Sequence, residues 1–490
     1  MEPTNHRRAT RKQRRKLDEK GSLRKKLPAL FLLATTVCAA CMGYYLSQIK
    51  KQTTNAPSKQ AQPAQTPEQL LMEKIAAEQK QLGNVENSRK KLTSHIQQLM
   101  YLPEVFDSSD SQQALSALLS EAAEQIDNSV DTKLVGYLTT SSSFGKILVA
   151  TPTVTTYQRK GDIWTSSSVL SGTAVYKNRL TLNTPTLSEL FQNPDDLSAV
   201  QLVIKQKLLE TVSDSSEMID QILSFPQVSI EQQLIAYSPQ EITISLPENS
   251  LDVSELTIPL VEILPFVDSD FVDPNIIHAQ AIKPLEPNKK YIALTFDDGP
   301  NPITTPRLLD ILKEKQVVAS FFLLGQNAAK QPDLVHRMSL EGHEVASHSY
   351  SHPKLTGLTP DAIRAEIYAA DEAIYEATGK LPRSFRPPYG AVNKQAAEII
   401  NRPIVQWSVD SEDWKSKNQD KIVKRIKETS FDRSIILMHD IYEETVDAVP
   451  EVIDELRAEG YEIIPVSRLL PPKRLPVHMY FGNKDEAVTQ

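Results

Sequence analysis

The spacing of hydrophobic positions divides the chain into four kinds of segment. An apolar run without Asp, Glu, Lys or Arg covers residues 27–49. From residue 67 to about residue 126, apolar residues recur at helical spacing, as Leu92, Ile96 and Leu99 do. Short runs rich in Thr, Val, Ile and Tyr then continue to about residue 269 and alternate with the period of a strand. From residue 290 onward, strand-like and helix-like stretches alternate regularly.

These patterns predict the order of the domains. The strand-rich region contains one clear helix, residues 196–212, and is expected to form a separate α+β domain. A Pro-rich stretch then leads into the last domain. The expected segments are a basic tail (1–26), a transmembrane anchor (27–49), a flexible linker (50–66), a helical segment (67–130), the α+β domain (131–272), a second linker (273–289), an α/β domain (290–470) and a C-terminal tail (471–490).

The last domain has the pattern of an α/β fold. Its seven strand-like runs begin near residues 291, 317, 343, 384, 404, 434 and 461. Helical stretches lie between them, and several end at a glycine, as expected for a helix C-cap. Strands that are separated by helices favour a parallel sheet. Seven such units in about 180 residues predict a distorted (β/α)7-type barrel, smaller than the usual eightfold barrel.

The apolar run of residues 27–49 is long enough for a transmembrane helix, because about 23 residues at about 1.5 Å each cross about 30 Å of hydrocarbon. The net charge of −8 conceals an asymmetry, since residues 1–26 hold eleven Lys or Arg and three acidic residues. A basic tail alone would suit nucleic acid, but the apolar run beside it favours a membrane, so no nucleic-acid partner is expected. The positive-inside rule predicts a single-pass protein of the cell membrane, with a cytoplasmic N-terminus and residues 50–490 outside. A cleaved signal peptide is the alternative.

The only two cysteines, Cys38 and Cys41, lie inside this apolar run. Their C-x-x-C spacing suits zinc or redox chemistry in a soluble protein. Within lipid they are expected to act as small apolar residues, with acylation as the alternative. The part outside the membrane has no cysteine, so its stability is expected to come from its core and not from disulfides.

Polar and aromatic residues follow five of the seven predicted strands. In a barrel of this kind the carboxyl ends of the strands meet at one rim, so we expect these residues to lie together. A lone "DDGP" is more typical of a turn, and only the other strand ends favour chemistry at the doubled aspartate. The rim residues are Asp297 and Asp298, His348 and His352, Arg386 and Tyr389, Asp413 and Trp414, and Leu437 and His439.

The two histidines after the third strand indicate a metal site. His348 and His352 are four residues apart, a spacing that on a helical turn puts both rings on one face. The pair alone is weak evidence, but with an aspartate at the same rim it forms a two-His, one-carboxylate set that leaves room for water. The sequence therefore predicts a divalent metal. The other histidines lack such neighbours and are assigned to the surface or core: His6, His95, His278, His336, His343 and His478.

Five sequence blocks follow the strands in order: "TFDDGP", "HSYSHP", "RPPYG", "DSEDW" and "LMHD". In order and spacing they resemble the motifs of polysaccharide deacetylases with a NodB homology domain, carbohydrate esterase family 4. The resemblance covers residues 291–470. Together with the anchor, the helical segment and the extra α+β domain, the chain looks most like Gram-positive peptidoglycan N-acetylglucosamine deacetylases. That second step rests on architecture alone.

The resemblance implies a role for each rim residue. It assigns the metal to Asp298, His348 and His352, the general base to Asp297 and the general acid to His439. The metal is expected to be zinc, with cobalt as an alternative. The other implied roles are that Asp413 orients His439, Arg386 pairs with Asp297, the Tyr389 backbone N–H binds the oxyanion, and Trp414 and Leu437 line the slot for the acetyl methyl. For the last two, plain packing at the barrel mouth is the alternative.

The implied activity is a metal-dependent deacetylation of N-acetylglucosamine residues in cell-wall peptidoglycan, outside the membrane. Two alternatives stay open. One is a deacetylase or O-acetyl esterase of another polysaccharide, such as chitin, an exopolysaccharide or xylan. The other is an inactive wall-binding protein, which the intact motifs disfavour. The sequence leaves protein partners unknown and assigns no role to residues 131–272.

Overall fold

The computed structural model describes residues 65–103, 109–212, 215–280, 283–482 and 484–488. From residue 71 onward, the described residues belong to one compact unit. The predicted basic tail, the predicted transmembrane anchor and residues 50–64 of the linker lie outside the described residues. In the part of the chain that is described, no helix is both long and apolar enough to cross a membrane.

The segment predicted to be helical, residues 67–130, is only partly so. Helix α3 (Pro67–Gln81) and helix α4 (Ser109–Glu124) confirm the prediction at the two ends. Between them lie strands β1 (Asn84–Lys91) and β2 (Ile96–Pro103), where the helix prediction is wrong.

Strand β2 buries apolar side chains on both faces of its sheet. Leu99 and Tyr101 pack with α3, whereas Ile96 and Leu102 pack with α4. Apolar residues on both faces hide the strand period, and the spacing of four between Leu92 and Ile96 imitates a helix. Pairing with the strand at residues 132–137 stabilises β2 as a strand, and the local spacing of apolar residues gives no sign of this pairing.

The N-terminal sheet also crosses the predicted domain boundary at residues 130 and 131. Strand β2 pairs in parallel with the first strand of the expected α+β domain, so the two expected segments form one sheet. The strand order is β1-β2-β3-β4-β5, and β6 also pairs with β4. The added strands are β3 (Thr132–Phe144), β4 (Ile147–Lys160), β5 (Ile163–Ser171) and β6 (Val175–Asn178).

A second group of elements follows the sheet and precedes the barrel. The predicted helix 196–212 is confirmed as α6 (Pro194–Thr211), which begins after Asn193 with a proline at its first position. The predicted linker 273–289 is wrong in part, because residues 274–280 form a helix. The other elements are α5 (Leu187–Leu190), α7 (Ser215–Leu223), β7 (Leu234–Tyr237), β8 (Glu241–Ser245), β9 (Glu255–Pro259), α8 (Leu260–Ile263) and α9 (Pro274–Gln280).

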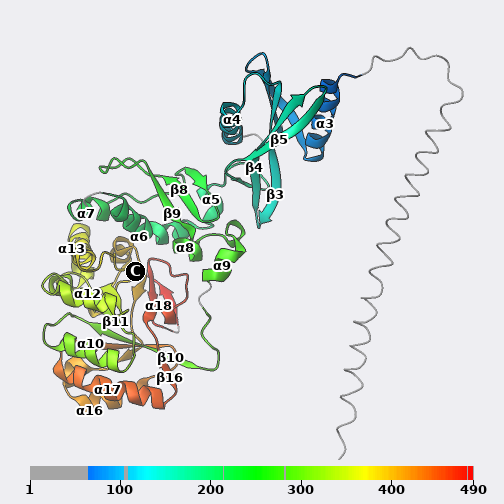
Figure 1. The fold of residues 1–490 in the computed structure, drawn as a ribbon. Helices are drawn as coiled ribbons and strands as arrows, with labels where there is room; N and C mark the ends of the chain where they lie inside the picture. Colours follow the sequence, from blue (N-terminus) through cyan, green and yellow to red (C-terminus); the bar gives the residue numbers. More distant parts are fainter. Residues whose placement is uncertain (1–64, 104–108, 213–214, 281–282, 483, 489–490) are drawn as a thin grey trace, which may run out of the picture. The chain divides into compact units, whose positions relative to one another are not determined.

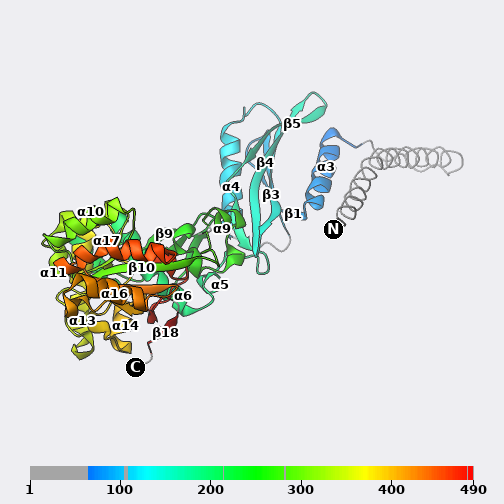
Figure 2. The same ribbon diagram turned by 90° about the horizontal axis from the view of Figure 1, so that it is seen from below.

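The prediction that the α/β domain has parallel strands joined by helices is confirmed (Figures 1 and 2). The main sheet has the order β12-β11-β10-β15-β14, and β16 pairs with the first residues of β10. All of these pairs are parallel. The strands are β10 (Lys290–Asp297), β11 (Ser320–Leu323), β12 (Glu344–Ser347), β13 (Ile404–Val405), β14 (Val409–Asp410), β15 (Ser434–His439) and β16 (Tyr461–Ile463).

Helices connect these strands and cover the outside of the sheet. Helix α17 contains Pro450. The helices are α10 (Thr304–Glu314), α11 (Gly325–Ala328), α12 (Pro332–Leu340), α13 (Pro360–Thr378), α14 (Lys394–Ile400), α15 (Asp413–Ser416), α16 (Gln419–Thr429), α17 (Glu443–Ala458) and α18 (Val466–Leu469).

The barrel does not have the seven complete strands that the sequence predicted. The predicted fourth strand is a single residue, Phe385, which bridges Ser347 of β12 and Ile404 of β13. The predicted fifth strand breaks into β13 and β14. A chain that contains "RPP" directly after Phe385 cannot extend a strand there, because proline lacks the N–H that the ladder requires.

The predicted C-terminal tail, residues 471–490, is wrong, because this segment completes the domain. Strand β17 (His478–Tyr480) pairs in parallel with β13, and β18 (Asp485–Ala487) pairs antiparallel with β17. Tyr480 and Val488 are buried in the barrel's hydrophobic clusters. The polar composition of the segment concealed two short strands that are held by this pairing.

Strand β10 shows how the core positions the site. Its even-numbered residues Ile292, Leu294 and Phe296 pack against α10 and α17, while Tyr291 and Ala293 belong to a second buried cluster. Helices cover one face and the barrel interior the other, which explains a continuous apolar run instead of alternation. By the same alternation the odd-numbered residues face the interior, so Asp297, the last residue of β10, is directed there.

Candidate active site

The carboxyl ends of the barrel strands bring the predicted rim residues together. Asp297 at the end of β10 is the register partner of His439 at the end of β15. Strand β12 ends at Ser347, directly before His348, and Arg386 follows the bridging residue Phe385. The expectation that chemistry gathers at one rim is therefore met by strand register.

Asp297 and Arg386 form an ion pair in the barrel interior. The Arg386 Nη1 donates to Asp297 Oδ1 at 2.6 Å and to the Thr295 hydroxyl at 2.8 Å. Both charged side chains are almost completely buried, and the guanidinium stacks 4.0 Å from the centre of the Phe322 ring. Burial raises the pKa of the Asp297 carboxyl, and the charge of Arg386 opposes that rise. The pair therefore holds an oriented carboxylate whose second oxygen, Oδ2, lies 3.7 Å from His348 Nε2.

Asp298 is directed away from Asp297 by its backbone and not by strand alternation. Strand β10 ends at Asp297, and Asp298 has a φ of 73°, in the left-handed region that Asp tolerates better than most residues. Its Oδ1 lies 3.6 Å from His348 Nε2 and 3.5 Å from His352 Nε2. The doubled aspartate is thus the end of a strand followed by a turn, and the two carboxylates have different neighbours.

Asp298, His348 and His352 form a cluster that can hold a metal ion, with one ligand atom of each residue within 4.8 Å of the others. Ligand bonds of about 2.0–2.2 Å in a tetrahedral site separate ligand atoms by about 3.3–3.6 Å, close to the distances here. Asp298 Oδ1 is buried and has no hydrogen-bond partner among the described residues. A buried carboxylate oxygen without a partner is costly, and a cation would satisfy it. The cluster therefore fits a divalent metal.

His348 is prepared as a neutral ligand. Its Nδ1 lies 2.6 Å from the Arg386 carbonyl oxygen, to which it donates as the N–H tautomer, and Nε2 is then left for coordination. Burial lowers the pKa of His348 to about 3, against the opposing charge of Asp298. The ring is therefore uncharged at neutral pH, as a metal ligand has to be.

The two histidines do not lie on a helical turn as the spacing predicted. No helix covers residues 348–352, and Ser349 and His352 have φ values of 67° and 66°. These two positive φ angles turn the loop so that the rings approach each other, with centroids 5.0 Å apart. The structure brings the two predicted residues together, but through an irregular loop and not through a helical turn.

His439 and Asp413 form a second hydrogen-bonded pair. His439 Nδ1 donates to Asp413 Oδ1 at 2.8 Å, and the His439 backbone N–H donates to Asp413 Oδ2 at 2.7 Å. The Thr445 hydroxyl and the Trp414 backbone N–H also donate to this carboxylate, which is completely buried. Burial alone would lower the pKa of His439, but the hydrogen bond and charge of Asp413, with Asp297 and Asp298, raise it to about 9. The ring is therefore protonated at neutral pH, and Nε2 is available.

The three predicted substrate-contacting residues lie around these pairs. Leu437 is two residues before His439 on β15 and shares its face, with 5% of its surface exposed. Tyr389 is 68% exposed, and its ring packs edge-on against His352 at 4.6 Å. Trp414 is 50% exposed at the beginning of α15. Leu437 is thus part of the barrel interior, whereas Tyr389 and Trp414 present aromatic surface to solvent.

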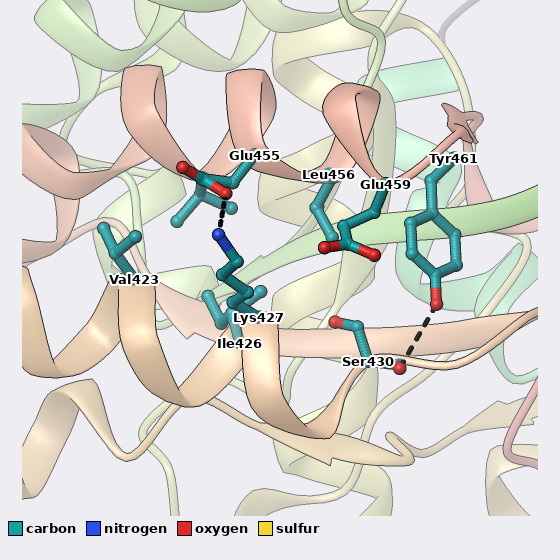
Figure 3. A pocket seen from close by; sticks show the side chains of 9 residues that line it. Val423, Ile426, Lys427, Ser430, Glu455, Leu456, Glu459 and Tyr461 are labelled. Atoms are coloured by element: carbon teal, nitrogen blue, oxygen red, sulfur yellow. Dashed lines mark hydrogen bonds and ion pairs between the residues drawn. The ribbon is translucent and has the colours of Figure 1, made fainter.

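An open hollow lies beside the predicted metal cluster. Its lining includes the ligand His352 and the exposed ring of Tyr389, together with Pro353, Lys354 and Ala391. Exposed aromatic rings next to a polar site are typical of surfaces that bind amphipathic ligands such as sugars. A smaller pocket between α16 and α17 (Figure 3) includes Tyr461, at the start of β16, which pairs with the opposite end of β10. That pocket is therefore far along the barrel from the strand ends that carry the predicted site.

Asp440 is a buried residue that the sequence analysis did not single out. The Thr305 hydroxyl donates to its carboxylate at 2.5 Å, and the Thr304 hydroxyl donates to its backbone oxygen. A Cβ atom on Gly299 would lie 2.3 Å from both Asp440 carboxylate oxygens, so the turn after Asp298 requires glycine. Burial raises the pKa of Asp440 to about 7. Its position directly after His439, in the block "LMHD", is the sequence feature that could have indicated it.

Gln406 is another supporting residue that was missed. Its amide group donates to the Gly390 carbonyl at 3.0 Å, and its backbone N–H donates to the carbonyl of Tyr480 in β17. The C-terminal strand therefore connects through Gln406 to the loop that carries Tyr389. Of the histidines assigned to surface or core, His343 is buried and its Nδ1 accepts from the Ala319 N–H, which confirms a structural position.

Comparison with known proteins supports the family resemblance. Residues 285–403 match the family model described as polysaccharide deacetylase. The peptidoglycan-N-acetylglucosamine deacetylase PgdA of Listeria monocytogenes is 38% identical over 236 residues, which cover 48% of this chain and 50% of the relative. The peptidoglycan-N-acetylmuramic acid deacetylase PdaC of Bacillus subtilis is 34% identical over 274 residues, 56% of each chain. A chitooligosaccharide deacetylase of Bradyrhizobium is 37% identical over 196 residues, 36% of this chain and 90% of the relative. The chain thus spans about half the length of the first two relatives.

Proposed function

The chain belongs to the polysaccharide deacetylase family, and on that premise we propose that it removes acetyl groups from N-acetylglucosamine residues of cell-wall peptidoglycan. The single observation that supports this most strongly is the arrangement at the barrel rim. A cluster that can hold a metal, with His348 as a neutral imidazole, lies beside the buried carboxylate of Asp297, and the same rim carries the protonated ring of His439. This combination suits the hydrolysis of an amide, because the carbonyl is a poor electrophile and the amine a poor leaving group.

The cluster of Asp298, His348 and His352 is the site proposed for a divalent metal, with zinc expected and cobalt as an alternative. When bound there, such a metal supplies Lewis acidity toward the acetyl carbonyl and lowers the pKa of a water molecule. The protein contributes a neutral imidazole at His348, whose orientation is fixed by its bond to the Arg386 carbonyl.

Asp297 is the proposed general base. Its Oδ1 is occupied by Arg386, and its Oδ2 lies 3.7 Å from His348 Nε2, which places this oxygen next to the ligand cluster. From there it can take the proton of the attacking water as the oxygen forms its bond to the acetyl carbon. The Arg386 charge fixes the direction of the carboxylate in an interior that would otherwise favour its neutral form.

His439 is the proposed general acid. Because Nδ1 donates to Asp413, the proton on Nε2 is the one that can pass to the glucosamine nitrogen as its bond to the acetyl carbon breaks. The products are acetate and a free amine. The Tyr389 backbone N–H is proposed to bind the oxyanion, and Leu437 and Trp414 to contact the acetyl methyl.

The substrate has one specific competitor. The relative from Bacillus subtilis is named for N-acetylmuramic acid, so the muramic sugar is the second candidate within the same polymer. The relative from Bradyrhizobium is named for chitooligosaccharides, which keeps neutral N-acetylglucosamine chains as a third. The exposed rings of Tyr389 and Trp414 suit any of these sugars.

We further propose that the protein works outside the cell, held to the membrane by residues 27–49. The support is the uncharged apolar run behind a tail with eleven Lys or Arg. Fractionation of cells that carry the chain with and without residues 1–49 tests this. The full chain is expected in the membrane fraction and accessible to external protease.

Acetate release by the purified chain tests the activity. The preparation has to include residues up to 488, because β17 pairs with β13 and supports the Tyr389 loop. Zinc-loaded protein is expected to release acetate from peptidoglycan and from N-acetylglucosamine oligomers, and protein treated with a chelator is not. Mass spectrometry of the product identifies which sugar lost its acetyl group. Release confined to acetylated xylan would contradict the proposed substrate.

A further inference from the structure

The loop between the two predicted histidine ligands is held by a side chain from another element. Glu366, on α13, directs both carboxylate oxygens at this loop. Its Oε2 accepts the backbone N–H groups of Tyr350 at 2.9 Å and Ser351 at 2.8 Å. Its Oε1 accepts the Ser351 hydroxyl at 2.6 Å. One carboxylate thus binds two successive residues that lie directly between His348 and His352.

The backbone of this loop needs such support. Ser349 and His352 both have positive φ angles, which residues with a Cβ adopt at a cost, so surrounding contacts have to stabilise them. Two successive N–H groups beside a left-handed residue form a concave site for an anion, and here the Glu366 carboxylate occupies it. Hydrogen bonds to an ionised acceptor are stronger than neutral ones. The loop shape and the position of Glu366 therefore depend on each other.

The opposite side of the loop is held by α11. The Gly325 N–H donates to the Ser349 carbonyl at 2.9 Å, and the Gln326 N–H donates to the Tyr350 carbonyl at 3.1 Å. A Cβ on Gly325 would lie 2.6 Å from the Cα of Ala370 in α13, so α11, α13 and the loop are closely packed. The loop is therefore bound on its N–H side by Glu366 and on its carbonyl side by α11.

We propose that Glu366 is a positioning residue for metal binding, which sets the direction of His352 relative to Asp298 and His348. It touches neither substrate nor the proposed metal, and it acts through the loop. This inference rests on the proposed metal site and goes beyond it, since it assigns metal affinity to a residue outside the five motif blocks. Residues that orient ligands typically change metal affinity by about 10-fold to 100-fold when they are removed.

Zinc affinity of the purified full chain tests the proposal, measured by competition with a chromogenic chelator. Glu366→Ala is expected to weaken zinc binding by about 10-fold to 100-fold, because all three hydrogen bonds are lost. Glu366→Gln is expected to lose less, since its amide oxygen still accepts both N–H groups. The visible absorption of the cobalt-loaded protein is expected to change in Glu366→Ala, because the ligand geometry relaxes.

The matched control is Glu376→Ala, an exposed glutamate on the same helix, which is expected to bind zinc as the parent does. Ser351→Ala provides a second variant at an exposed loop position, and it is expected to bind zinc more weakly than the parent through loss of one bond. Zinc affinity of folded Glu366→Ala within twofold of the parent would overturn the proposal. If Glu366→Ala does not fold, parental affinity in Ser351→Ala would overturn it instead. A parent that binds zinc but releases no acetate would contradict the proposed function and leave this inference standing.

Discussion

Two histidine-bearing strand ends of the barrel, at β12 and at β15, give the same side chain opposite properties. His348 after β12 is completely buried beside another imidazole, and burial lowers its pKa to about 3. His439 at the end of β15 is also mostly buried, but its ring donates to the Asp413 carboxylate, and its pKa rises to about 9. Burial disfavours the charged ring at both positions, and only at His439 does a carboxylate on Nδ1 outweigh that effect, so one histidine is neutral and the other cationic.

The doubled aspartate at β10 lies between these two regions and serves both. Asp298 faces the two histidines after β12, whereas Asp297 is the register partner of His439 and the ion partner of Arg386. Adjacent carboxylates would repel if both lay free in one low-dielectric site. Here the Arg386 guanidinium pairs with Asp297, and the predicted metal would bind Asp298.

The largest expected effect comes from removing a proposed metal ligand near His348. His352→Ala is expected to abolish stoichiometric zinc binding and to lower kcat/KM by about 10³-fold or more, since metal assistance supplies several kcal/mol of barrier reduction. Zinc content after dialysis and acetate release measure the two effects. His343→Ala, which removes a buried histidine at the opposite end of β12, is the control and is expected to retain zinc. Full zinc content in His352→Ala would exclude this residue as a ligand.

The second largest effect is expected from a change beside His439, the proposed general acid. Asp413→Asn is expected to lower kcat/KM by about 10²-fold, because His439 loses the charge that keeps it protonated and oriented. Zinc binding is expected to be unchanged, since Asp413 bonds to His439, Thr445 and Trp414 and not to the ligand cluster. If Asp413→Asn lost zinc as well, the separation of the two regions would be wrong.

The pH dependence sharpens the same separation. The folded pKa of His439 is raised, so its protonated form stabilises the fold fully below about pH 6.5, and this contribution is lost as pH rises through about 9. Activity that needs this proton is expected to fall over the same range, with an alkaline limb near pH 9. In Asp413→Asn the limb is expected at lower pH. An alkaline limb at the same pH in both proteins would assign it to a different group.

The smallest expected effect is at the rim. Trp414→Ala removes a half-exposed ring, so its free energy of unfolding is expected to change by less than about 0.5 kcal/mol. Because the ring is proposed to contact the sugar, KM is expected to rise several-fold while kcat changes little. Steady-state kinetics on N-acetylglucosamine oligomers, with thermal unfolding as a check, separate the two. An unchanged KM would leave Trp414 as a packing residue only.

The sequence predicted the parallel α/β domain and placed ten candidate residues at one rim, because strand ends can be recognised from apolar runs that stop at polar residues. It did not predict how His348 and His352 converge, since positive φ angles at Ser349 and His352 leave no pattern in the sequence. Glu366 lies outside the motif blocks, and only the fold brings it to the loop.

The errors outside the site have a common physical cause. Strand β2 has apolar residues on both faces, and β17 and β18 are only three residues long each. In β2 and β17, pairing with a strand farther along the chain outweighs the local pattern, and β18 then pairs with β17. The C-terminal pairing matters for the site as well. The Gln406 backbone N–H donates to the Tyr480 carbonyl, and the Gln406 side chain donates to the Gly390 carbonyl in the loop that carries Tyr389.

The central claim is that the two adjacent aspartates divide the work, with Asp298 holding the metal and Asp297 moving a proton. Zinc stoichiometry and acetate release, measured on one preparation of Asp297→Asn, test this most directly. The asparagine oxygen still accepts from Arg386 Nη1, so the site is expected to keep its shape. The account predicts one zinc per chain and no acetate release above background from peptidoglycan. A zinc-free Asp297→Asn protein, or a zinc-bound one with parental activity, would contradict it.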